Sequence, residues 1–518
     1  MAGEPYYITT PIYYVNDVPH IGHAYTTLAC DTLARFMRLD GREVFFLTGT
    51  DEHGQKVEQA AKAAGVAPQD MADRNSERFR ALACDMGYTN DDFIRTTEER
   101  HARAVQHLWR ELAERGEIYL GKYAGWYSVR DEAFFAEKEL IKGPNGKLLA
   151  PTGTGAEVEW VEEPSYFFQL SAWGDRLLAF YDANPDFIAP DSRRNEVVSF
   201  VRGGLQDLSI SRTTFTWGVP VPGDPAHVMY VWIDALTNYL TAVGYPDREN
   251  KTFSKFWPAN LHLVGKDILR FHAVYWPAFL MGAGLAPPKR IFAHGWWTIE
   301  GQKISKSLGN AIDPYELVEK YGRDQMRYFL LREVPFGNDG DFSRAAMVQR
   351  VNGDLANGIG NLAQRTLTLI QKNCGAAVPD PGAMIDDDRA LIEGAAGLLP
   401  GLCDHMSRQE FHKALQVILA VVGEADSYID ANAPWALGKT DPARMATVLY
   451  VLAETIRNVA IVLQPFTPDA AAKILDQLAV ATDSRAFANL GEKGALVPGT
   501  SLPAPRGVFP RLEAEPAV

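Results

Sequence analysis

The stretch that decides the fold runs from Pro5 to Gly54 and reads PYYITTPIYYVNDVPHIGHAYTTLACDTLARFMRLDGREVFFLTGTDEHG. Its first aromatic and β-branched run, Tyr6 to Thr9, predicts a strand, and the proline-containing residues after it predict a turn. A helix is expected next, and Val44 to Leu47 reads as a second buried strand. These elements make a βαβ unit, which opens a parallel sheet covered by helices. The apolar positions that share one face of the helix are Leu28, Ala29, Leu33, Phe36 and Met37.

A second strand-and-helix pattern lies much later in the chain. Leu261 to Val264 predicts a strand, and residues 118–226 between the two patterns predict a mostly β insertion. Ligands of parallel sheets bind at the carboxyl ends of the strands. Pro11 to His23, Thr50 to His53 and Gly265 to Asp267 fall at such ends, so we expect them to converge on one crevice.

From Asp313 onward, helical patterns dominate almost to Leu478. Asp313-Pro314-Tyr315-Glu316 is typical of a helix start, with an N-cap, a proline at the first helical position and an acid that can complete a capping box. Breaks fall at Pro379-Asp380-Pro381 and Ala433-Pro434. We therefore expect a helical bundle.

The composition limits the class of protein. With 518 residues, 47% of them hydrophobic and 22% charged, we expect two to four folded domains. The net charge of −14 argues against a surface coated by nucleic acid but allows a local basic track. No apolar run approaches the length of a bilayer span and Met1 to Pro5 is unlike a signal peptide, so we expect a cytoplasmic protein.

His20-Ile21-Gly22-His23 stands where the first turn meets the start of the helix. Helix N-termini bind phosphate, because their backbone N–H groups and dipole favour negative charge. Both histidines can donate to phosphate oxygens, and Gly22 allows a nucleotide to approach the backbone closely. Two ordinary loop histidines are the alternative interpretation of this string alone.

Lys303-Ile304-Ser305-Lys306-Ser307 follows a predicted strand, Trp296 to Ile299. Two lysines with interposed hydroxyls can neutralise a triphosphate whose charge develops during the reaction. A solvated basic loop is the alternative, but both strings in this order, each at a strand end, favour a nucleotide site.

The two strings resemble the HIGH and KMSKS signatures of class I aminoacyl-tRNA synthetases, with Ile304 in place of the signature methionine. The resemblance covers nearly the whole chain. It implies an α/β fold with a Rossmann-type parallel-sheet catalytic domain, split by a mostly β insertion and followed by an α-helical bundle that binds the anticodon. The boundaries we assign are 1–117 and 227–293 for the catalytic halves, 118–226 for the connective insertion, 294–350 for a stem-contact region with the Lys303 loop, and 351–518 for the anticodon-binding domain and tail.

Further strings resemble the methionyl-tRNA synthetase family, among them Gly49-Thr50-Asp51-Glu52-His53-Gly54 and Val231-Trp232-Ile233-Asp234-Ala235. The resemblance implies that Asp51 takes the substrate ammonium. A thioether is uncharged, so its selection depends on shape and on polarizable aromatic contact. Core packing is the alternative role for each aromatic residue, above all for Tyr239. The implied methionine site consists of Pro11, Ile12, Tyr14, Asp51, Trp232, Ala235, Leu236, Tyr239 and His272.

The resemblance also implies an ATP site. Asp267 would accept a hydrogen bond from a ribose hydroxyl, or it could simply cap a helix. Trp297 would lie beside the adenine through its backbone. The ATP-binding residues are His20, Gly22, His23, Gly265, Asp267, Trp297 and Lys306, and the catalytic ones are His20, His23, Lys303 and Lys306.

Asn361, Arg365 and Trp435 resemble the residues with which methionyl enzymes read the CAU anticodon. Single-stranded bases can stack on an aromatic ring and hydrogen-bond to amide and guanidinium groups. A tryptophan buried at a helix end is the alternative for Trp435.

The implied reaction joins methionine to ATP as methionyl-adenylate and then transfers methionine to the terminal adenosine of tRNA(Met), including the initiator. Its cofactors are ATP and Mg²⁺. Many methionyl enzymes hold zinc in cysteine knuckles, but this chain has no cysteine from 85 to 373, so we expect no structural zinc. Because the chain stops without an appended dimer-forming domain, we expect a monomer, and we expect no membrane partner.

Three alternatives remain at the level of sequence. A leucine, valine or isoleucine enzyme should carry a longer editing insertion, and a cysteine enzyme should carry cysteine-rich zinc ligands. A non-catalytic RNA-binding paralogue should have lost phosphate-binding residues, yet His20, His23, Lys303 and Lys306 are all present.

Overall fold

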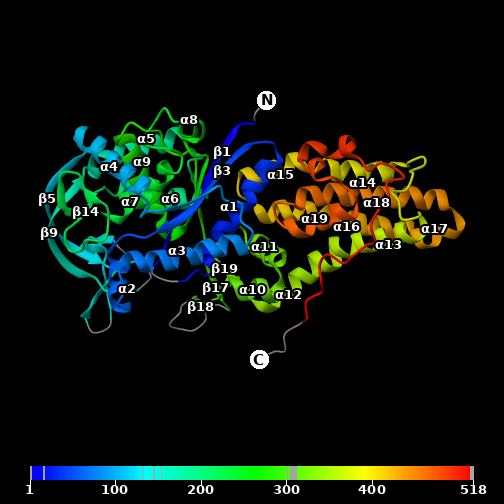
Figure 1. The fold of residues 1–518 in the computed structure, drawn as a ribbon, viewed down its shortest axis with the longest axis horizontal. Helices are drawn as coiled ribbons and strands as arrows, with labels where there is room; N and C mark the ends of the chain where they lie inside the picture. Colours follow the sequence, from blue (N-terminus) through cyan, green and yellow to red (C-terminus); the bar gives the residue numbers. More distant parts are fainter. Residues whose placement is uncertain are drawn as a thin grey trace. The chain divides into compact units, whose positions relative to one another are not determined.

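The computed structural model describes residues 3–15, 18–131, 133–143, 146–152, 155–299, 302–303 and 312–513. The chain divides into two compact units. Residues 5–19 and 44–294 make up what we call the sheet unit, and residues 1–4, 20–43 and 295–518 make up the helical unit. The elements of both are labelled in Figure 1.

A seven-stranded sheet is the centre of the sheet unit, with the strand order β10-β16-β15-β1-β3-β2 and with β4 paired to β3. The registers described for this sheet are all parallel. The predicted strands are confirmed as β1, β3 and β15, and the neighbouring strands β1 and β3 are joined through a helix as expected for a βαβ unit. The strands are β1 (Pro5–Thr9), β2 (Tyr13–Tyr14), β3 (Glu43–Asp51), β4 (Asp92–Arg95), β10 (Ile188–Ala189), β15 (Leu261–Gly265) and β16 (Ile291–His294).

Helices accompany the strands of this sheet, and several of them contribute residues to one large hydrophobic core. In that core Leu108 and Leu112 of one helix are fully buried, as is Leu240 of another. The helices are α2 (Gln55–Ala64), α3 (Pro68–Asp85), α4 (Glu99–Glu114), α7 (Val231–Thr241), α8 (Lys251–Phe256), a π-helical turn (Phe271–Tyr275) and α9 (Trp276–Gly282).

The predicted insertion is built mainly around two long antiparallel strands, β5 and β9, which appear as a curved pair in Figure 1. Two helices also belong to this stretch, and its strand β10 joins the main sheet. The remaining elements are β5 (Ile118–Ser128), β6 (Ala133–Phe135), β7 (Ile141–Lys142), β8 (Leu148–Leu149), β9 (Glu159–Phe168), α5 (Gly174–Ala183), α6 (Asp191–Arg202), β11 (Leu208–Ser209), β12 (Ser211–Arg212), β13 (Pro220–Val221) and β14 (Asp224–Met229).

The helical unit begins with α1 (Ile21–Leu39), the helix predicted from the opening stretch. Its five predicted apolar positions are each at most 8% exposed, which confirms the predicted face. Gly41 follows the helix with a φ of +84°, a conformation in which an L side chain would be strained. Phe36 packs against Phe487 with ring centroids 4.9 Å apart, so α1 shares a core with the C-terminal residues.

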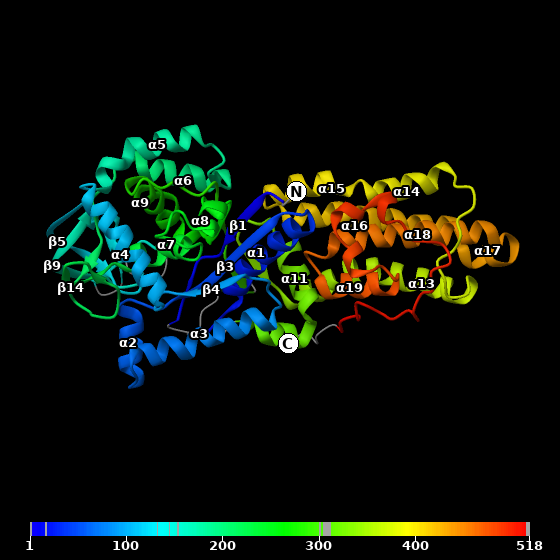
Figure 2. The same cartoon turned by 45° about the horizontal axis from the view of Figure 1, so that its top comes forward.

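A bundle of helices fills the rest of the helical unit, as predicted, and α16 and α18 run side by side in both views (Figures 1 and 2). The predicted N-cap is confirmed, because the Asp313 side chain accepts from the backbone N–H of Tyr315. The elements are β17 (Trp297–Ile299), β18 (Gln302–Lys303), α10 (Pro314–Tyr321), α11 (Arg323–Arg332), β19 (Gly340–Phe342), α12 (Arg344–Arg350), a π-helical segment (Val351–Gly360), α13 (Asn361–Asn373), α14 (Asp386–Ala396), α15 (Leu398–Ser407), α16 (Phe411–Asn432), α17 (Pro434–Thr440), α18 (Pro442–Leu463) and α19 (Pro468–Gln477).

The helix α18 corrects one expectation. Among the described residues it alone is long and apolar enough to cross a membrane by length and composition. However, 94% of its most apolar window is buried inside the protein, as in the central helix of a bundle. This burial explains why an apolar run of this length occurs in a helix of the bundle.

Candidate active site

The loops predicted to hold ligands lie at the carboxyl ends of neighbouring strands. The strands β15, β1 and β3 are adjacent in the sheet, and they end at Gly265, Thr9 and Asp51. Tyr14 of β2 is the register partner of Asp51. Within the sheet unit the residues that follow these strands share one edge of the sheet, as predicted, and their convergence on one crevice stays a prediction.

Aromatic rings from two segments pack face to face at this site. Trp232 of α7 stacks on Phe271 with ring centroids 3.7 Å apart and planes only 5° from parallel. Its ring is 6% exposed, and among the described residues its indole Nε1 has no hydrogen-bond partner. His272 meets the edge of the same indole at 6.1 Å. The α7 helix and the π-helical turn thus bring together the aromatic side chains that were predicted separately.

The protonation of His272 follows from its two neighbours. Its Nδ1 lies 2.9 Å from the backbone carbonyl of Ile268, which can only accept, so Nδ1 carries the proton. Burial lowers the pKa of His272 to about 4, although the Ile268 hydrogen bond and the Asp267 charge act in the opposite direction. The imidazole is therefore neutral, and Tyr239 donates its hydroxyl to Nε2 at 2.7 Å. This part of the predicted methionine site is uncharged, which suits an uncharged side chain.

A second histidine, His262, supports Tyr239 from behind and was missed by the sequence analysis. The Tyr239 ring stacks on the His262 ring with centroids 4.1 Å apart. Trp276 donates its indole N–H to Nε2 of His262 at 3.3 Å, so Nδ1 is the nitrogen that donates to Thr9 Oγ1 at 2.8 Å. Burial keeps the pKa of His262 well below its usual value. These two hydrogen bonds fix the orientation of the His262 ring, on which the Tyr239 ring stacks.

Asp234 is the second group that sequence analysis did not single out. Its carboxylate bridges two histidines, with Oδ2 2.7 Å from His53 Nδ1 and Oδ1 2.8 Å from His101 Nε2. Burial alone would raise the pKa of Asp234, but the charges and hydrogen bonds of the two histidines lower it to about 2. Because His53 follows Asp51 by two residues and Asp234 lies on α7, this bridge joins the strand end to the pocket helix. Its signal in the sequence was an acidic residue inside an otherwise uncharged helix.

Gly265 leaves room for the Asp267 side chain at the strand end. A Cβ atom at this position would lie 2.6 Å from Oδ1 of Asp267, far inside van der Waals contact. Asp267 lies in a short 3-10 turn, Lys266–Ile268, directly after the strand. The glycine therefore allows the Asp267 carboxylate to fold back against the backbone.

In the helical unit, His20 and His23 form a reciprocal cap at the start of α1. Nδ1 of His20 accepts from the backbone N–H of Gly22, and Nδ1 of His23 accepts from the backbone N–H of His20, each at 3.1 Å. The two rings lie 3.8 Å apart. A neutral ring that accepts at Nδ1 carries its proton on Nε2, which is the donor form that a phosphate oxygen requires. The predicted phosphate motif is thus also the N-terminal cap of its helix.

The remaining ATP residues of the helical unit are described in part. Trp297 is buried, and its ring meets the edge of Tyr25 of α1 at 5.5 Å. Its side chain is therefore part of the core, which suits the prediction that its backbone meets the adenine. Lys303 is described through its backbone in β18, whereas Lys306 lies outside the described residues.

The predicted anticodon residues lie on neighbouring helices of the bundle. The Arg365 guanidinium stands 5.4 Å from the centre of the Trp435 ring, and it also pairs with Asp430 at 2.9 Å. Trp435 is 50% exposed, so the alternative of a buried helix-end tryptophan is wrong. Asn361 is exposed one helical turn before Arg365. The arrangement offers an open aromatic ring beside a cation.

Comparison with known proteins agrees with this geometry. Residues 6–367 match the family model described as tRNA synthetases class I (M), and residues 378–517 match the anticodon binding domain of methionyl tRNA ligase. The methionine–tRNA ligase of Rhizobium meliloti is 59% identical over 514 residues, covering 99% of both chains. That of Mesorhizobium japonicum is 58% identical over 516 residues, covering 100% of this chain and 99% of its own.

The chain belongs to the methionyl-tRNA synthetase family.

Solved structures of the family extend this result to the fold. The Mycobacterium tuberculosis methionyl-tRNA synthetase in complex with methionyl-adenylate is 55% identical, with a TM-score of 0.96 over 98% of this chain and 100% of its own. Its apo form is 51% identical, with a TM-score of 0.90 and 99% coverage of both chains. The predicted fold class is thereby confirmed: a Rossmann-type sheet domain with a C-terminal helical anticodon domain.

A metal site in this family member was not expected. Within the part of the chain that the structure describes, no three His, Cys, Asp or Glu side chains group so as to hold a metal ion. The lack of a structural zinc stays a prediction, which elemental analysis of the purified protein would contradict by finding stoichiometric zinc.

Proposed function

We propose that this family member activates methionine with ATP to methionyl-adenylate and pyrophosphate, and then transfers methionine to the terminal adenosine of tRNA(Met). One observation supports the amino acid assignment most directly. A buried carboxylate, Asp51, and a stacked, uncharged aromatic site lie on one edge of the sheet. Methionine has a matching pair of features, an ammonium group and an apolar, polarizable thioether.

The methionine site has two parts in this proposal. Asp51 binds the ammonium group. Trp232, Tyr239 and His272 contact the thioether side chain, which a neutral His272 leaves in uncharged surroundings. A site without a charged partner disfavours polar amino acids, because their side chains would lose hydrogen bonds to water. Tyr14 and the remaining residues complete the walls, namely Pro11, Ile12, Ala235 and Leu236.

The ATP-binding residues predicted from the sequence each have a role in this proposal. Asp267 accepts from a ribose hydroxyl, and Gly265 allows the backbone to approach the nucleotide. His20 and His23 donate to phosphate oxygens, and Gly22 keeps that approach open. Lys303 and Lys306 neutralise the charge that develops on the phosphates, while Trp297 meets the adenine through its backbone. Mg²⁺ accompanies ATP and supplies further phosphate neutralisation when bound.

The first chemical step requires positioning more than proton transfer. The methionine carboxylate attacks the α-phosphate, an oxygen–phosphorus bond forms, and pyrophosphate leaves with the bond electrons. A hydroxyl of the terminal adenosine then attacks the methionyl carbonyl, and AMP leaves. Fixed hydrogen bonds and charges account for most of the acceleration in such reactions.

The bundle binds the anticodon in this proposal. A loop base stacks on Trp435, and Asn361 and Arg365 donate to base edges. Because the initiator tRNA also carries the CAU anticodon, we propose that it is recognised in the same way. We also propose the domain boundaries assigned from the sequence, a monomeric enzyme and a cytoplasmic location.

ATP–pyrophosphate exchange with each standard amino acid tests this function. Methionine alone should support rapid exchange. A variant with Lys306→Ala should lose exchange by orders of magnitude while methionine affinity hardly changes. Exchange with another amino acid would contradict the specificity, and binding of tRNA without any exchange would instead support the non-catalytic paralogue.

A further inference from the structure

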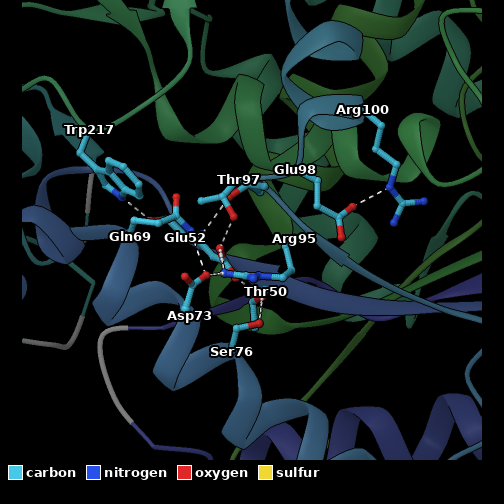
Figure 3. Close-up of polar contacts among 11 residues, drawn as sticks. Thr50, Glu52, Gln69, Asp73, Ser76, Arg95, Thr97, Glu98, Arg100 and Trp217 are labelled. Atoms are coloured by element: carbon cyan, nitrogen blue, oxygen red, sulfur yellow. Dashed lines mark hydrogen bonds and ion pairs between the residues drawn. The ribbon is translucent and has the colours of Figure 1, made fainter. Parts of the chain in front are cut away.

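The residue after Asp51 has a carboxylate that is completely enclosed by donors. Glu52 is 0% exposed. Arg95 grips it with two parallel hydrogen bonds, from Nε at 2.7 Å and Nη2 at 2.9 Å. Thr50 Oγ1 donates at 2.7 Å and Thr97 Oγ1 at 2.5 Å (Figure 3). We call this group of four side chains the Glu52 clamp.

The backbone of Glu52 is held as firmly as its side chain. Its N–H donates to Thr96 Oγ1 at 2.9 Å. Its carbonyl accepts from the indole N–H of Trp217 at 2.6 Å (Figure 3). Trp217 lies near the end of the insertion and Thr96 follows β4, so distant parts of the sequence meet at this one residue.

Arg95 is itself held in place by residues of the helix α3. Its guanidinium also pairs with Asp73 of α3, and Gln69 donates to the same Asp73 oxygen at 2.9 Å (Figure 3). Ser76 of that helix lies 3.0 Å from the Thr50 hydroxyl. The clamp therefore joins β3, β4 and α3.

Stability alone does not account for such an arrangement. A buried ion pair is often no more stabilising than an apolar pair of similar volume, because both charges lose their water. A two-point guanidinium–carboxylate contact does fix geometry, however. Thr50 and Glu52 flank Asp51 in the sequence and are hydrogen-bonded to each other, so the clamp holds the chain on both sides of Asp51 at the end of β3.

We infer that Arg95 and Glu52 are positioning residues for the ammonium group of methionine. This inference rests on the role proposed for Asp51. The clamp fixes the backbone next to Asp51, and it pairs the negative charge of Glu52 with Arg95. Arg95 thus acts on the substrate through Glu52 and Asp51 and has no contact with the reacting atoms.

The test compares Arg95→Gln with a matched control, Arg100→Gln. Arg100 lies five residues further along the chain and pairs with Asp92 at 2.8 Å. It also pairs with Glu98 at 2.5 Å and makes no contact with the clamp in Figure 3. Arg95→Gln should raise the methionine KM in pyrophosphate exchange about 10- to 100-fold, since small misplacements of binding groups have effects of this size. The ATP KM should change little, and Arg100→Gln should leave both values near those of the unchanged enzyme.

Two ligands and a double variant separate positioning from a general loss of structure. Methioninol keeps the ammonium group and lacks the carboxylate, whereas 4-(methylthio)butanoate keeps the carboxylate and lacks the ammonium group. Arg95→Gln should weaken inhibition by methioninol and leave inhibition by the butanoate unchanged. Combined with Asp51→Asn, Arg95→Gln should add almost nothing to the rise in methionine KM.

Equal weakening of both inhibitors, or fully multiplicative effects in the double variant, would overturn the inference. If Arg95→Gln fails to fold by thermal unfolding, Thr97→Val removes one donor to Glu52 and should raise the methionine KM severalfold. An unchanged KM in Thr97→Val would then count against the clamp. Asp51→Asn alone reports on the proposed function, because an unchanged methionine KM in that variant would refute Asp51 as the ammonium ligand.

Discussion

Two tryptophans with proposed substrate contacts differ sharply in their surroundings. Trp232 is 6% exposed and stacked on Phe271, whereas Trp435 is 50% exposed beside Arg365. A small apolar ligand gains affinity from a site that is already formed and dry, because little must be reordered when it binds. A base of an RNA loop arrives with its own stacking face and needs an open ring. The same side chain serves both purposes because its environment differs.

Two buried carboxylates extend this comparison to charge. Asp234 in the sheet unit has both oxygens paired with histidines, and its pKa is about 2. Asp324 in the helical unit accepts from the Ala470 N–H at 2.6 Å through one oxygen, and among the described residues the other has no hydrogen bond. Burial raises the pKa of Asp324 to about 6, against the effects of that hydrogen bond and nearby arginines. The pKa of a buried carboxyl group can therefore be lowered or raised, depending on its hydrogen-bond and charge partners.

The largest expected effect is that of Trp232→Ala. Removing a buried indole costs about 3–5 kcal/mol of packing, and it opens one wall of the methionine site. We expect a rise in methionine KM of more than about 100-fold in pyrophosphate exchange. The KM for tRNA in aminoacylation should stay within about twofold of its value in the unchanged enzyme. A large change in the tRNA KM would contradict the proposal that Trp232 serves methionine and Trp435 serves the tRNA.

Asp234→Asn and Asp324→Asn should change stability in opposite directions. The folded pKa of Asp234 is depressed, so its contribution is present above about pH 4 and is lost as the pH falls through 2. The folded pKa of Asp324 is raised, so stability falls as the pH rises from about 4 to about 6, by up to about 3 kcal/mol. At pH 7.5 Asp234→Asn should destabilise the protein and Asp324→Asn should stabilise it.

Urea unfolding at pH 5 and pH 7.5 measures both effects. The gain from Asp324→Asn should shrink at pH 5, where more of the carboxyl is protonated in the folded protein. A gain of equal size at both pH values would show that its charge is not the cause.

Trp435→Ala should have a moderate effect confined to RNA. Loss of one stacked base costs about 1–3 kcal/mol, so the tRNA KM should rise roughly 5- to 150-fold. Pyrophosphate exchange and the unfolding midpoint should stay unchanged, since the ring is half exposed. Trp435→Phe keeps an aromatic face and should recover most of the affinity; equal losses in both variants would contradict stacking.

The smallest expected effect concerns His272. With a pKa of about 4, this imidazole stays neutral from pH 6 to pH 8, so it should add no titration to the methionine KM in that range. The pH profiles of the unchanged enzyme and of His272→Gln should run parallel. A step near pH 6.5 that disappears in the variant would show a titrating imidazole.

Much of the architecture was predictable because it depends on local patterns. The face of α1 follows from apolar residues at helical spacing, and the Asp313 cap follows from a local sequence motif. The elements of the insertion were harder to predict, because α5, α6 and β10 lie inside a stretch whose residue pattern is mostly typical of β-strands. Such elements depend on packing partners that are distant in the sequence.

The sequence by itself determined the family, the opening βαβ unit, the later helical bundle and the identity of the chemical groups, since each depends on residues close together in the chain. Only the tertiary structure decided which groups meet. His101 and Asp234 are 133 residues apart in the sequence, and Trp217 and Glu52 are 165 residues apart. Each of these pairs is nevertheless hydrogen-bonded in the folded protein. The protonation states of His272, Asp234 and Asp324 also depend on burial and partners. Those are properties of the folded chain, because desolvation arises only when distant segments exclude water together.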